Sequence, residues 1–93
     1  MANNSGSITS GGTSQAAVAA DPSRRRLFVE NPPSATESLF VAFGEAATVN
    51  GGTPNSYELG PGGVLEFIGD MCPNTSINVI AATTGHKFIC FTN

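Results

Sequence analysis

The sequence has no tryptophan, one tyrosine, one histidine and two cysteines among its 93 residues, and only 12% of its residues are charged. The single histidine, His86, lies beside a predicted turn, and any acid–base catalysis by imidazole would depend on this one side chain. The carboxylates are scattered singly and form no close pair of the kind that a glycosidase uses. No CxxC or paired-histidine pattern accompanies the cysteines. We therefore predict a protein that is not an enzyme, with no catalytic residue, no cofactor and no metal site.

The balance of charge argues against two further classes of protein. Four basic residues stand against seven acidic ones, and the one basic cluster is Arg24, Arg25 and Arg26. Strand alternation would send Arg25 to the face opposite Arg24 and Arg26, so the cluster is interpreted as solvated or salt-bridging. No apolar run approaches the length of a membrane span, and the N-terminus lacks the pattern of a secretory signal. We expect neither nucleic acid nor a membrane as a partner.

The chain length predicts one domain of low stability. A chain of this size buries roughly 60–65% of the surface that it exposes when unfolded, so a disulfide, a metal or oligomerisation is the usual additional support. Cys72 and Cys90 could form one disulfide, but two buried thiols acting as small apolar side chains are the favoured interpretation. Oligomerisation therefore becomes a central expectation.

Short strands separated by turn signals are predicted from residue 14 onward. The most strand-like runs are Leu27–Glu30 and Leu39–Phe43, which we expect to form a pair that the other strands cover. Both sides of the second run are apolar, as in a strand that is covered on two faces. Further strands are predicted at Ser14–Ala20 (with a helix as the alternative), Glu45–Val49 (a short edge piece), Asn55–Leu59, Val64–Ile68, Thr75–Ala82 and His86–Thr92.

Turn signals separate these strands at regular intervals. In the tetrapeptide that ends at Gly63, Pro61 fixes φ at the second position and Gly62 supplies a positive φ at the third, so a type II turn is predicted before the partner strand Val64–Ile68. Other turns are predicted at Asp21-Pro22-Ser23, Asn50-Gly51-Gly52 and Thr83-Thr84-Gly85. The predicted fold is all-β: a small antiparallel β-sandwich or flattened barrel of seven to eight strands.

Residues 1–13 differ in composition from the predicted sandwich at 14–93. They are mainly Gly, Ser, Thr and Asn, with Ile8 as the one branched aliphatic residue. Such a segment buries too little apolar surface to offset its ordering entropy, so we predict a flexible N-terminal arm. The arm is either a disordered tail or a segment that becomes ordered on a neighbouring subunit.

Four stretches together resemble a family of small β-sandwich structural proteins of tailed bacteriophages. They are Arg25–Pro32, with its Arg-x-Leu and Asn-Pro elements, and Leu39–Ala47, Glu58–Gly63 and Asn78–Gly85. The resemblance spans most of residues 14–92 and leaves out the arm. Members of this family are head decoration (cement) proteins or modules at the base of fibres and tail parts.

The resemblance implies a virion structural protein on the capsid surface, assembled in the host cytoplasm. It would clamp neighbouring subunits of the major capsid protein as a small homo-oligomer, with a trimer as the first expectation and a dimer as the second. We assign partner contacts to Ile8 and Thr9 of the arm and to Arg24 and Arg26. The alternatives are a tail or fibre adaptor module and a β-sandwich that binds carbohydrate or a host surface.

Overall fold

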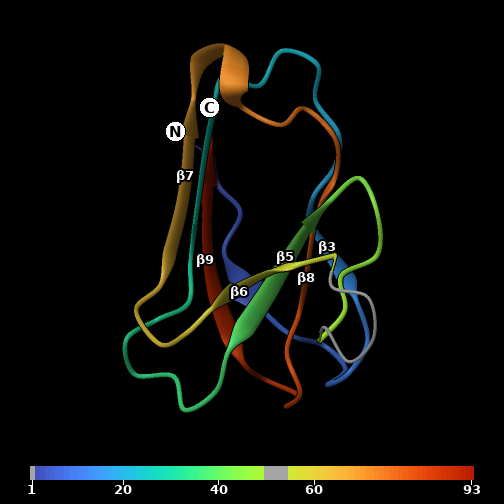
Figure 1. The fold of residues 1–93 in the computed structure, drawn as a ribbon, viewed down its shortest axis with the longest axis vertical. Coiled ribbons are helices and arrows are strands. Elements are labelled where there is room, and N and C mark those ends of the chain that lie inside the picture. The colour runs from blue at the N-terminus through green and yellow to red at the C-terminus, as the bar shows by residue number, and fades with distance from the viewer. Residues whose placement is uncertain (1, 50–54) are drawn as a thin grey trace.

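The computed structural model describes residues 2–49 and 55–93, which form two antiparallel sheets packed face to face (Figure 1). The predicted all-β sandwich is confirmed. The first sheet has the order β1-β9-β4-β7, with β2 also paired to β9, and contains β1 (Ala2–Asn3), β2 (Gly6–Ser7), β4 (Arg26–Glu30), β7 (Val64–Ile68) and β9 (Lys87–Thr92). The second has the order β3-β8-β5-β6 and contains β3 (Gln15–Val18), β5 (Leu39–Phe43), β6 (Tyr57–Leu59) and β8 (Ile77–Ile80). A 3-10 turn, η1 (Gly69–Met71), follows β7.

Alternate residues of the central strands build the core between the sheets. Side chains of a strand point to opposite faces in turn, so one apolar set from each strand meets the other sheet. From the first sheet Leu27, Val29 and Cys90 are fully buried, and from the second sheet Val41 and Val79 are fully buried. Cys90 and Cys72 are free thiols, which confirms the favoured interpretation of the two cysteines.

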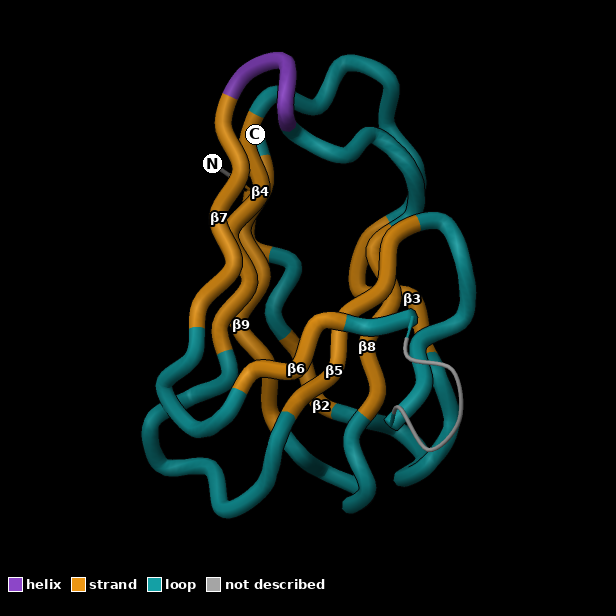
Figure 2. Tube along the Cα trace, in the orientation of Figure 1, coloured by secondary structure: helices purple, strands orange, loops and turns teal. Residues whose placement is uncertain are grey.

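The two strongest predicted strands do not pair with each other. β4 lies in the first sheet and β5 in the second, and β6 and β7 are likewise divided between the sheets (Figure 2). The pairing expectation was wrong because the segment with Pro32 and Pro33 crosses from one sheet to the other instead of forming a hairpin. The predicted type II turn is confirmed, with Gly62 at φ 81 and the Gly63 amide 2.8 Å from the Gly60 carbonyl, but it too connects the sheets.

The N-terminal segment is part of the sandwich, and the prediction of a flexible arm is corrected. β1 and β2 pair with β9, and the amide of Asn4 donates to the carbonyl of Cys90 at 2.7 Å. Ile8 is 1% exposed and belongs to the core. The backbone groups of this segment bond to the otherwise open edge of β9. The composition of the segment alone does not indicate that such an edge is available. The sandwich therefore begins at residue 2 of the described chain, not at residue 14.

Smaller expectations have mixed outcomes. β3 is a strand and not a helix, and its pairing with β8 has a register shift between Ala16 and Val18. Glu45–Val49 forms no strand; instead Ala47 packs with Ala42 on the outward side of the second sheet, so both sides of β5 are covered as predicted. The turn predicted at Asn50-Gly51-Gly52 lies outside the described residues.

Candidate functional site

Of the four residues predicted to contact a partner, the structure buries two and exposes two. Ile8 and Arg24 are 1% and 3% exposed, so neither side chain can contact a partner on the folded surface. The prediction that Ile8 and Arg24 contact a partner was wrong, because Ile8 packs in the core and the side chain of Arg24 points into the protein. Thr9 is exposed, and its amide donates to the side chain of Gln15 at 2.8 Å. Arg26 is exposed on β4.

Arg24 is a buried structural tie. Its Nη1 donates to the carbonyls of Pro73 and Thr75 at 2.9 and 2.8 Å, and its Nη2 donates to the carbonyl of Ala19 at 2.7 Å. The alternation predicted for the arginine cluster fails because β4 begins only at Arg26, so Arg24 lies in the preceding turn. The guanidinium thus joins the turn before β4 to the loop before β8.

The two neighbouring arginines form the salt bridges that the sequence interpretation allowed. Arg25 Nη1 lies 2.8 Å from Asp70 Oδ1, with both side chains largely in solvent. Arg26 Nη2 lies 3.4 Å from Glu66 Oε2, with both side chains near half exposure. Exposed pairs of this kind contribute little to stability, on the order of 0–1 kcal/mol.

The outward surface of the first sheet carries five apolar side chains among charged ones. Residues that alternate with the core positions of β4, β7 and β9 point away from the interior. We call this surface the outer face; its apolar members are Phe28, Val64, Ile68, Ile89 and Phe91, and its charged members are Arg26, Glu30, Glu66 and Lys87. Val64 and Ile68 are 46% and 61% exposed. A sheet face of this composition is typical of a surface that another protein covers.

The outer face has aromatic rings beside an ion pair. Phe28 and Phe91, on neighbouring strands, have ring centroids 6.3 Å apart. Together with Arg26 and Glu66 they line a shallow hollow of about 460 Å³. Aromatic side chains with an arginine at the centre of a patch are the composition that protein interfaces favour. The sequence does not place these phenylalanines on the surface, because alternation alone does not say which of the two apolar sides of a strand lies inside.

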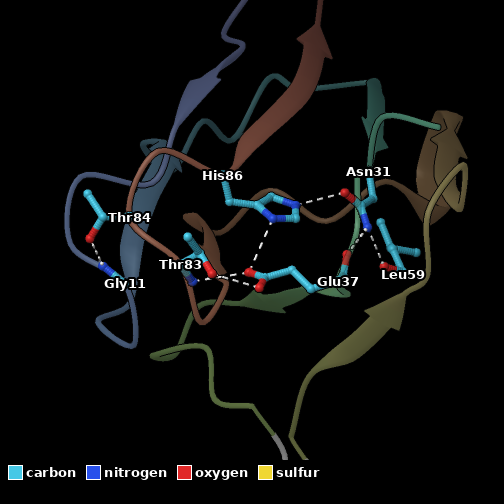
Figure 3. A network of polar contacts seen from close by, with 7 residues as sticks. All are labelled: Gly11, Asn31, Glu37, Leu59, Thr83, Thr84 and His86. Carbon is cyan, nitrogen blue, oxygen red and sulfur yellow. Dashed lines mark hydrogen bonds and ion pairs between the residues drawn. The ribbon is translucent and has the colours of Figure 1, made fainter. Parts of the chain in front are cut away.

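A polar network joins the β4–β5 connection to the β8–β9 turn (Figure 3). Asn31 Nδ2 donates to the carbonyls of Glu37 and Leu59 at 3.0 and 2.8 Å, and Asn31 Oδ1 lies 2.8 Å from His86 Nε2. His86 Nδ1 lies 3.3 Å from Glu37 Oε2. The carboxylate of Glu37 also accepts hydrogen bonds from the hydroxyl and the amide of Thr83. These bonds hold the pKa of Glu37 below its usual value, the Thr83 hydroxyl being the largest cause.

The geometry of this network is that of a structural tie. Because Asn31 Nδ2 faces two carbonyls, its Oδ1 is the atom that faces the imidazole, and the second ring nitrogen faces a carboxylate. A general base needs a nitrogen that is free to accept a proton from a substrate. Both nitrogens of His86 are already engaged, although the network borders a pocket of about 300 Å³ that Thr84 and Lys87 also line. No local sequence pattern indicates this network, because its members are far apart in the chain.

Comparison with known proteins assigns neither a family nor a function to this chain. No protein family model, curated protein or solved structure matches this chain. Within residues 2–49 and 55–93, no group of three or more His, Cys, Asp or Glu side chains is arranged to hold a metal ion. The same described residues contain no helix that is long and apolar enough to span a membrane.

Proposed function

We propose that this chain is a non-enzymatic virion structural protein, resembling a phage capsid decoration protein that clamps neighbouring subunits of the major capsid protein. The outer face is the observation that carries this proposal. Its five apolar side chains are presented by a hydrogen-bonded sheet, so they form a rigid surface rather than a mobile loop. The Arg26–Glu66 pair within it supplies both signs of charge for orienting a partner.

The mechanism would be thermodynamic linkage. A protein that binds the assembled shell and not its separated subunits stabilises the shell by its own binding free energy. At a free concentration one hundred times its Kd, each bound copy contributes about 2.7 kcal/mol. Copies on a repeating lattice act together, so modest affinity at each site is sufficient.

The first test is cryo-electron microscopy of the particle with which the chain copurifies. We expect regular density at lattice axes, with the outer face against capsid subunits. Density at a single vertex or along the tail would instead indicate the adaptor function and would contradict the decoration mechanism. Binding to glycans without binding to particles would favour the carbohydrate-binding alternative.

A pair of variants tests the surface itself. Ile89→Lys places a charge at a partly buried position of the outer face, whereas Val49→Lys changes an apolar residue that is 47% exposed and lies outside that face. We expect Ile89→Lys to remove the gain in thermal stability that the chain gives to bare heads, and Val49→Lys to preserve it. Equal behaviour of the two variants would exclude the outer face as the contact surface.

A further inference from the structure

The open edge of β7 carries unpaired backbone groups at alternate residues. On the β4 side the amide of Gly69 donates to the carbonyl of Arg25 at 2.7 Å, and the amide of Asn31 donates to the carbonyl of Gly63 at 3.0 Å. Residues of an antiparallel strand direct both backbone groups to one side and then the other in turn. The odd-numbered residues of β7 therefore bond to β4. β7 lies at the edge of the first sheet (Figure 1). The backbone groups of its even-numbered residues, Val64, Glu66 and Ile68, therefore point to the open edge.

This edge lacks the features that protect the other edges of the described sandwich. β3 has an irregular register, β6 has three residues, and β1 and β2 have two residues each. β7 pairs with β4 over five consecutive positions without a bulge, and it contains no proline or lysine. Its exposed side chains include Val64 and Ile68. Natural proteins seldom leave a regular, apolar edge strand uncovered.

The sequence of β7 is symmetric about its centre. Val64-Leu65-Glu66-Phe67-Ile68 has β-branched residues at its ends, large apolar residues next to them and one charge in the middle. In a two-fold antiparallel pair centred on Glu66, Val64 would face Ile68 of the second copy, and Leu65 would face Phe67. Because the even-numbered residues point outward, this register joins their backbone groups by about six hydrogen bonds. We propose that β7 pairs with β7 of a second copy of this chain, forming a dimer with a continuous sheet.

The dimer has a consequence for the outer face, although the pairing itself does not depend on capsid binding. A two-fold axis between paired antiparallel strands is perpendicular to the sheet, so the outer faces of both copies lie on the same side. One dimer thus presents two apolar surfaces to a repeating partner, and the second contact becomes intramolecular. The one unfavourable feature is the apposition of the two Glu66 side chains, each of which has Arg26 of its own copy 3.4 Å away.

Two substitutions at Glu66 are expected to act in opposite directions. Glu66→Pro removes an outward-facing amide and leaves the β4 ladder intact, so the variant should fold and remain monomeric. Glu66→Gln keeps the amide and removes the like-charge apposition, so its dimer should dissociate up to about fivefold less readily than that of the wild type. Sedimentation equilibrium of the purified chain from micromolar to millimolar concentration measures both effects, with near-UV circular dichroism as the check on folding.

Amide hydrogen exchange of the wild-type chain provides a test that does not depend on folding of the proline variant. With rising concentration, the amides of Val64, Glu66 and Ile68 should gain protection, while those of Leu65 and Phe67 should be protected throughout. A monomer at millimolar concentration, a trimer, or protection without this alternation would overturn the proposal, and so would a weaker dimer for Glu66→Gln. Because no particle is present, failure here leaves the capsid-binding proposal to be judged by its own experiment.

Discussion

Replacement of Arg24 should destabilise the fold far more than replacement of its neighbour Arg25. Arg24 donates three hydrogen bonds to the carbonyls of Ala19, Pro73 and Thr75, and it is 3% exposed. Hydrogen bonds from a charged donor contribute about 1.5–3 kcal/mol each, but removal of a buried charge also removes its desolvation cost. For Arg24→Met we therefore expect a net loss of about 3 kcal/mol in the free energy of unfolding. Such a loss lowers Tm by about 12–24 °C in a domain of this size.

Urea denaturation followed by far-UV circular dichroism measures this loss. With a typical m-value for a small domain, the midpoint should fall by about 1–3 M. Arg25→Met is the matched control, because its ion pair with Asp70 lies in solvent, and it should change stability by no more than about 0.5 kcal/mol. Arg24→Lys should fall between the two, since an ammonium group cannot span the carbonyls that the guanidinium joins. Equal losses for Arg24→Met and Arg25→Met would refute the reasoning.

Three further predictions concern the polar network and the thiols. Asn31→Ala leaves two carbonyls and the imidazole of His86 without their partner, so it should cost about 2–4 kcal/mol in urea denaturation, and a loss below 1 kcal/mol would contradict this. The folded pKa of Glu37 is depressed, so its contribution to stability should be present above about pH 4.5 and be lost as the pH falls through the folded value; Glu37→Gln should flatten this limb of the stability curve. Burial raises the pKa of Cys90 to about 11 and raises that of Cys72, so both thiols should react slowly with iodoacetamide at pH 8 and rapidly in urea, with Cys90 the slower when folded.

Local patterns were sufficient to predict the strands from β3 to β9 and the turn before β7. The alternation of Phe88 and Cys90 with Ile89 and Phe91 predicted β9, and the structure buries the first pair and turns the second outward. The glycine and proline positions before β7 predicted its turn type, because φ is restricted by the residue itself. These features depend on neighbours within a few positions, and such information is contained in the sequence.

The tertiary structure alone decided which strands pair and which polar side chains are buried. A flexible composition at residues 2–8 became two strands and a core residue because β9 offered an open edge. Arg24 is anchored by carbonyls 49 and 51 positions along the chain, and Asn31 meets His86 across 55 positions. The alternation of side chains along a strand is the same whichever sheet the strand belongs to and whichever strand it pairs with. The choice among neighbours depends on burial and hydrogen bonding between distant residues, which exist only once the chain has folded.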